Sequence, residues 1–185
     1  YVAPQNAYVE RTGTKSYYVH DEVVGVDIDT EQMKADMLTD GWDCKVYDFI
    51  YTQPVSVSEL KEILFMDTLA PHPPSLDTSN AGRTTNVKLA AEEVNGTVLL
   101  PAGGGRDGDE FSFNDIVGER SESLGYQNAT VFANGEMVDG IGGGICQVSS
   151  TVYVAALKAD LEITERHSHV FSVAYVPLGQ DATVH

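Results

Sequence analysis

A run of three glycines followed closely by a cysteine constrains this chain more than any other feature. Residues 140–151 read GIGGGICQVSST. After the cysteine, apolar residues recur at three- and four-residue spacing, which is typical of one face of a helix. They are Val148, Val152, Tyr153, Ala155, Ala156, Leu157 and Ala159. The pattern predicts a buried helix that ends near Asp160 and carries Cys146 on its first turn.

The start of a helix suits a reactive cysteine. Backbone N–H groups point outward there, and the helix dipole stabilises negative charge, including that of a thiolate. The glycines let a ligand approach the backbone closely, so Gly143 and Gly144 can donate to an oxyanion. The segment therefore predicts a cysteine nucleophile beside an anion-binding backbone. The alternative is that Cys146 packs as a small hydrophobic residue behind a tight turn. A phosphate loop is disfavoured, because no Gly-Lys-Ser/Thr follows the glycines.

The charge of the chain excludes several classes of partner. Eleven Lys and Arg stand against 28 Asp and Glu, a formal net charge of −17. Such a chain repels nucleic acid and anionic lipid, so we expect neither as a partner. The two cysteines, Cys44 and Cys146, lie far apart, and their spacing leaves a disulfide between them open.

The sequence contains no signal peptide and no membrane-spanning run. It begins without Met. We therefore expect a fragment, attached to a membrane only through a segment that this chain does not include.

The first 67 residues predict a small α+β unit. Residues 1–25 alternate like a hairpin with Thr12-Gly13 as its turn. A capped helix is predicted over residues 29–41, with Asp29 at its start and an apolar stripe of Met33, Met37 and Leu38. A strand follows over 44–51, where Cys44 is expected to pack, and then a second capped helix begins at Ser56.

A proline-rich connection at residues 70–81 is the predicted boundary, and His72 within it is expected to be exposed. The second domain, residues 75–185, predicts a helix over 86–94 and strand-like alternation at 111–114. It also predicts a hairpin turning on Asn134-Gly135 and a strand over 163–177. The loop at 101–110 lacks the spacing of a phosphate or calcium loop. The fold class is α+β, with the cysteine helix expected to pack on β-strands.

Two histidines on the predicted 163–177 strand are candidate bases for Cys146. Period-two geometry places His167 and His169 on one face, and Asp181 or Glu165 could orient the imidazole. The alternatives are one exposed and one buried structural histidine, or a metal site. A site built from Cys146, His167 and His169 lacks paired-cysteine spacing and a fourth ligand, so we expect no metal.

Four motifs together resemble the VanW family over residues 75–184. They are FSFN at 111–114, GIGGGICQVSST at 140–151, ERHSH at 165–169 and YVPLGQDATV at 175–184. Residues 1–67 resemble the small domain, described as peptidoglycan-binding, that often precedes VanW in bacterial envelope proteins. The resemblance departs from the family in two places. The 101–110 loop is longer than usual, and the chain ends at His185 where members continue, so we expect a C-terminally truncated VanW domain.

The resemblance implies a peptidoglycan L,D-transpeptidase of the extracytoplasmic cell envelope, needing no cofactor and linking stem peptides by 3–3 bonds. The sequence lacks the Ser-His-Gly-Cys motif of the better-known L,D-transpeptidases. The resemblance implies that Cys146 is the nucleophile. His169 is the expected base, helped by Asp181 or Tyr175, and it is preferred to His167 because its place in the motif matches the family more closely. The expected substrate-binding residues are Gly143, Gly144, Gln147 and Arg166, the last by gripping a carboxylate or, alternatively, forming a surface ion pair. A non-catalytic peptidoglycan or glycopeptide binder and a cysteine hydrolase of stem peptides stay open.

Overall fold

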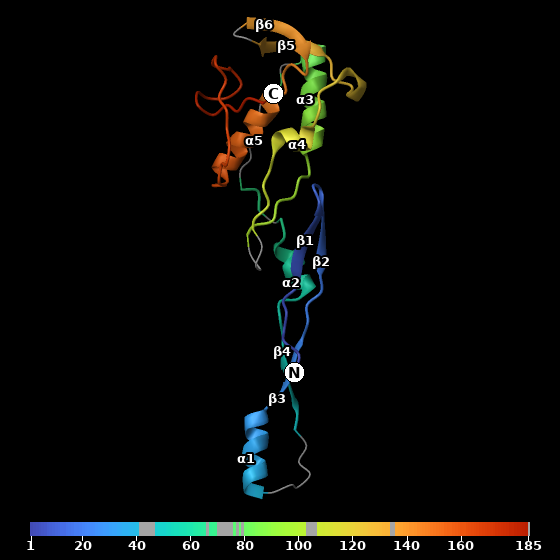
Figure 1. The fold of residues 1–185 in the computed structure, drawn as a ribbon, viewed down its shortest axis with the longest axis vertical. Helices are drawn as coiled ribbons and strands as arrows, with labels where there is room; N and C mark the ends of the chain where they lie inside the picture. Colours follow the sequence, from blue (N-terminus) through green and yellow to red (C-terminus); the bar gives the residue numbers. More distant parts are fainter. Residues whose placement is uncertain are drawn as a thin grey trace.

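The computed structural model describes residues 1–40, 47–65, 67–69, 76, 78, 80–102, 107–133 and 136–184. Figure 1 shows an elongated molecule, with the N-terminal elements along one half of its length and the C-terminal helices gathered at the other end. Within these residues, three separate antiparallel strand pairs, β1–β2, β3–β4 and β5–β6, accompany the helices. This confirms the α+β class.

The N-terminal half is built from two strand pairs. Strands β1 (Tyr8–Gly13) and β2 (Ser16–His20) form the predicted hairpin, but Gly13 pairs with Ser16, so the turn falls on the two residues between them. Strand β3 (Gly25–Ile28) pairs with β4 (Phe49–Thr52). The strand predicted over 44–51 thus begins at Phe49 within the described residues, and Cys44 lies outside them.

Both predicted N-terminal helices are present. Each begins at a capping residue that the sequence reveals. Helix α1 (Thr30–Asp40) follows Asp29, whose Oδ1 accepts the Gln32 N–H at 2.8 Å. Helix α2 (Val57–Ile63) begins with a full capping box between Ser56 and Glu59. The predicted apolar stripe of α1 is not buried: Leu38 is 88% exposed.

The C-terminal half contains helix α3 (Ala81–Val94), helix α4 (Phe113–Val117) and the short 3₁₀ helix η1 (Glu122–Leu124). Helix α3 starts five residues before its predicted start, because Asn80 caps it through the Arg83 N–H at 2.9 Å. Helix α4 replaces the alternation predicted at 111–114, since the Ser112 hydroxyl caps the Asp115 N–H.

The second predicted hairpin is present as β5 (Asn128–Ala133) paired with β6 (Glu136–Ile141). Its predicted turn at Asn134-Gly135 lies outside the described residues. So do His72 in the predicted connection and residues 103–106 of the 101–110 loop.

Helix α5 (Cys146–Lys158) confirms the helix predicted after the glycine run. It packs against α3 through a core that includes Val87, Ala90, Ile145 and Val148. Ile141 of β6 packs against the same core, and Gly143, just before the helix, lies against the backbone of β5. Its buried residues are Gln147, Val148, Ser149, Ser150 and Val154, which differ from the predicted apolar stripe because polar partners lie beside its first turns.

The segment after α5 differs most from its prediction. The strand predicted over 163–177 is wrong: residues 161–184 contain no helix or strand. Its backbone is tied instead by long-range contacts, such as the Thr183 N–H donating to the His167 carbonyl at 2.8 Å. These contacts lay residues 181–184 along the start of α5, where Ser149 and Ser150 bond the backbone of Ala182.

The two halves meet at the tip of the β1–β2 hairpin. The Thr14 carbonyl accepts the Val98 N–H at 3.0 Å, and the Lys15 ammonium donates to the Glu92 carbonyl at 2.8 Å. Among the residues described, no helix has the length and apolar character needed to cross a bilayer.

Candidate active site

Cys146 is a free, half-buried thiol at the first residue of α5. Its Sγ lies 3.6 Å from the Thr183 hydroxyl oxygen and 3.7 Å from the Val184 carbonyl oxygen. Both partners belong to the segment that runs along the helix start. The sulfur therefore lies among polar groups at a helix start and is not sealed in a hydrocarbon core.

The approach to Cys146 is fixed by close backbone packing. A Cβ on Gly143 would lie 2.6 Å from the Thr130 carbonyl oxygen of β5. The fully buried Asn86 donates to the carbonyls of both Gly143 and Gln127, at 3.0 and 2.9 Å. Helix α3 and strand β5 thus clamp the glycine run from two sides and set the position of the cysteine.

Backbone donors are available at the helix start. Within the described part of the chain, no bond is recorded from the N–H groups of Gly143, Gly144 and Cys146 to a protein acceptor. The Gln147 N–H, in contrast, donates to the Gly144 carbonyl at 3.0 Å. Unused amides beside a thiol are the groups that could stabilise an oxyanion.

His169 and Asp181 form a pair close to this helix start. The Asp181 carboxylate accepts the His169 backbone N–H at 2.6 Å and lies 2.8 Å from ring Nδ1. The two side chains are only 9% and 12% exposed. Burial alone would raise the pKa of Asp181, but the hydrogen bonds from His169 and the charge of Arg166 outweigh it and lower that pKa. Asp181 therefore stays ionised and holds Nδ1, which leaves Nε2 for other partners.

Tyr175 lies against the ring of this pair. Its hydroxyl lies 3.4 Å from His169 Nε2. Burial, with a further contribution from the nearby Cys146 charge, raises the pKa of Tyr175 to about 12. The hydroxyl is thus neutral at physiological pH and can both accept and donate a proton. The structure thus joins Tyr175, His169 and Asp181, and it lays the residues that follow Asp181 against Cys146, which precedes His169 by more than 20 residues.

Two other predicted residues, His167 and Arg166, do not face the cysteine in the predicted roles of base and substrate clamp, because their polar groups bond Glu165 and Asp181. The His167 side chain is 65% exposed, and its ring Nε2 lies 2.7 Å from the Glu165 carboxylate. The Arg166 guanidinium bonds both the carbonyl and the carboxylate of Asp181, at 2.7 and 3.0 Å. The structure thus places Arg166 behind the histidine–aspartate pair, and His167 on the surface.

Arg83 is the residue that sequence analysis missed. It lies on the first turn of α3, and its Nη2 donates to Gln147 Oε1 at 2.6 Å. Its guanidinium carbon lies 6.0 Å from the centre of the Tyr175 ring. The sequence does contain a signal for its position: Asn80 is a favourable helix cap, and a helix that begins there includes Arg83 on its first turn.

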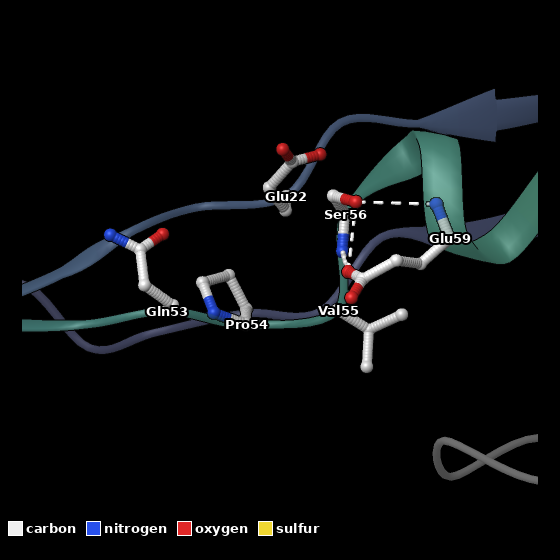
Figure 2. Close-up of a pocket in the computed structure, with 6 residues that line it drawn as sticks. All are labelled: Glu22, Gln53, Pro54, Val55, Ser56 and Glu59. Carbon is white, nitrogen blue, oxygen red and sulfur yellow. Dashed lines mark hydrogen bonds between the residues drawn. The ribbon is translucent and has the colours of Figure 1, made fainter.

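An open pocket also lies in the N-terminal half, but its carboxylates are already used in local hydrogen bonds. It is lined by Glu22, Gln53, Pro54, Val55, Ser56 and Glu59, as Figure 2 shows. Both carboxylates are used locally: Glu22 accepts the Val57 N–H at 2.9 Å, and Glu59 bonds Ser56.

Among the described residues, no group of three or more His, Cys, Asp or Glu side chains is placed to hold a metal ion.

The fold and this cluster define an α+β domain in which a glycine-led helix start presents a free cysteine near a buried histidine–aspartate pair. The chain belongs to the VanW family, whose profile, described as VanW like protein, matches residues 82–185.

Two curated proteins are similar in sequence. The uncharacterized protein YoaR of Bacillus subtilis (strain 168) is 41% identical over 127 residues, which cover 69% of this chain and 40% of YoaR. The vancomycin B-type resistance protein VanW of Enterococcus faecalis (strain ATCC 700802 / V583) is 33% identical over 104 residues, covering 54% of this chain and 36% of that protein. The chain thus matches about two fifths of the length of each relative. No solved structure matches it.

Proposed function

We propose that this chain carries the catalytic centre of a peptidoglycan L,D-transpeptidase of the bacterial cell envelope. The observation that supports it best is that Asp181, which holds His169 beside Tyr175, begins the segment whose Thr183 and Val184 contact the Cys146 sulfur at the start of α5. A nucleophile, a base and a group that orients the base are the parts that acyl transfer needs. Membership of the VanW family and the similarity to an enterococcal vancomycin resistance protein support a cell-wall context.

The first step acylates the cysteine. The thiol proton passes through the Tyr175 hydroxyl to His169 Nε2, and Sγ attacks the carbonyl carbon of the third residue of a tetrapeptide stem. The new S–C bond forms a tetrahedral oxyanion, which accepts hydrogen bonds from the free amides of Gly143, Gly144 or Cys146. The C–N bond then breaks, and the departing D-alanine takes the proton from His169 as its amine leaves.

The second step transfers the acyl group. The side-chain amine of the third residue of another stem attacks the thioester carbonyl and gives one proton to His169. A C–N bond forms, the S–C bond breaks, and the sulfur recovers a proton from His169. Asp181 stays ionised throughout and stabilises the imidazolium that forms in each step, as its lowered pKa permits.

The test is to incubate the chain with purified tetrapeptide muropeptides and to analyse the products by mass spectrometry. We expect cross-linked dimers from the unmodified chain and none from Cys146→Ala, a loss of at least about 10³-fold for a missing nucleophile. The matched control is Cys44→Ala, which removes the chain's other cysteine and should leave dimer formation unchanged.

Two results would replace the proposal. Trimmed monomers that depend on Cys146 would make the chain a hydrolase, in which water takes the place of the second amine. Muropeptide binding without any Cys146-dependent product would make it a binding protein.

A further inference from the structure

Arg83 places a positive charge near the start of α5, in contact with the residue after the cysteine. Its Nη2 bonds Gln147, the residue after Cys146, at 2.6 Å. Its Cγ lies 2.8 Å and its Nη1 3.1 Å from where a Cβ on Gly144 would be, so its side chain fills the space left by that glycine. The guanidinium is therefore within one side chain's length of the helix start.

The surroundings of Arg83 differ from those of Arg11 and Arg166. Arg11 and Arg166 pair with Asp109 and Asp181, at 3.6 and 3.0 Å. No ion pair joins Arg83 to a carboxylate of the described residues, although the chain has 28 acidic residues. A guanidinium has five N–H donors, and the bond to Gln147 uses one of them. A cation on the first turn of a helix is also disfavoured by the helix dipole, so this position does not favour Arg83 for helix stability.

We propose that Arg83 binds the terminal carboxylate of the donor stem peptide, next to the bond that Cys146 breaks. This inference rests on the proposed function. In a stem ending in D-alanine, three bonds separate the attacked carbonyl carbon from the carboxylate carbon, so the anion must lie close to the nucleophile. The planar guanidinium suits bidentate recognition of a carboxylate. Arg166, the residue expected from sequence to bind that group, already uses its Nε and Nη2 on Asp181.

The test measures binding separately from turnover. In the Cys146→Ala background, calorimetry compares a tetrapeptide stem that has a free terminal carboxylate with the same peptide as a carboxamide. We expect the acid to bind about 10- to 100-fold more tightly than the amide, as for a charge-assisted pair. Arg83→Gln should remove this preference. Lys88→Gln, a loss of equal charge at an exposed position of the same helix, should keep it.

Arg83→Lys is a second variant. It should retain part of the preference because it keeps the positive charge, and lose part because lysine cannot form the bidentate contact of a guanidinium. An acid preference that survives in Arg83→Gln overturns the inference. So does a change in iodoacetamide reactivity of Cys146 in Arg83→Gln without any change in the acid preference, since Arg83 would then act on the thiolate. The proposed function is judged separately, by Cys146-dependent dimers from the unmodified chain.

Discussion

At the scale of single residues, Asp181 determines what the histidine can do. Its carboxylate holds His169 at both the backbone N–H and ring Nδ1, while Arg166 holds the carboxylate from the other side. The ring is thereby fixed with Nε2 toward Tyr175. An ionised Asp181 is stabilised by three different donors, and this is why its pKa falls despite burial.

The lowered pKa of Asp181 makes its contribution to stability depend on pH. A carboxyl whose pKa is lower in the folded state stabilises the fold above its unfolded pKa, near 3.9, and loses that contribution as the pH falls through the folded value. We expect Asp181→Asn to lower the free energy of unfolding by about 1–3 kcal/mol at pH 7. The difference between variant and parent should shrink steadily below pH 4, as measured by urea unfolding.

The control for this experiment is Asp139→Asn, at an exposed position of β6. Its stability should follow that of the parent at every pH. A difference between Asp181→Asn and the parent that stays constant from pH 7 to pH 3 would mean that the charge of Asp181 contributes nothing to the fold.

At the scale of elements, the start of α5 is positioned by its neighbours more than by its own sequence. No side chain caps this helix. Its position is set by Gly143, which contacts β5, and by Asn86 of α3, which bonds the Gly143 carbonyl. Small disturbances at this junction should therefore move Cys146 as well as reduce stability.

Gly143→Ala tests this junction. The added Cβ would lie 2.6 Å from the Thr130 carbonyl oxygen, a backbone atom that cannot rotate away. We expect a loss of about 1–3 kcal/mol in unfolding free energy, the usual cost of overpacking, and an altered rate of Cys146 alkylation. The matched control is Gly96→Ala, which has φ +79° but no atom within 4 Å of the new Cβ. It should show backbone strain alone, with an unchanged alkylation rate. Equal effects of both variants on alkylation would disprove the clamping of the helix start.

Local patterns predicted local elements and failed where the contacts are distant. Helices α1 and α2 could be predicted, since Asp29 and Ser56 act within three residues of themselves. The 163–177 strand could not be rejected, because its alternation is real but its partners are side chains and backbone of residues 181–184.

The residues of the candidate site could also be predicted where the signal is local, but not where it depends on distant contacts. Cys146 could be proposed from the glycine run and the helical pattern after it, and His169 and Asp181 from their place in the motifs. The choice of Asp181 over Glu165 as the partner of His169 could not be made in advance, because their contact depends on how the 12 residues from His169 to Asp181 turn without regular structure. Arg83 was missed because it is adjacent to the site only in space.

At the scale of the whole molecule, an elongated shape is combined with a large negative charge. The hairpin tip in the N-terminal half reaches the C-terminal half through two cations, Arg11 and Lys15, which contact Asp109 and the Glu92 carbonyl. Elsewhere the net charge of −17 produces repulsion between carboxylates that the fold must tolerate. Salt should therefore act in two opposite directions, by weakening the cation contacts and by screening the repulsion.

With so many more acidic than basic residues, we expect the screening of repulsion to win. The screening length falls from about 30 Å at 0.01 M salt to about 8 Å at 0.15 M, so carboxylates on neighbouring elements stop interacting. The Tm should rise by several degrees between about 10 mM and 300 mM sodium chloride, as followed by circular dichroism. The control carries Glu119→Gln, Glu122→Gln and Glu136→Gln, three exposed positions whose neutralisation changes the net charge from −17 to −14. Its Tm should be higher at low salt and should respond less to added salt. A Tm that falls with salt in both proteins would mean that the contacts of Arg11 and Lys15 outweigh the repulsion between carboxylates.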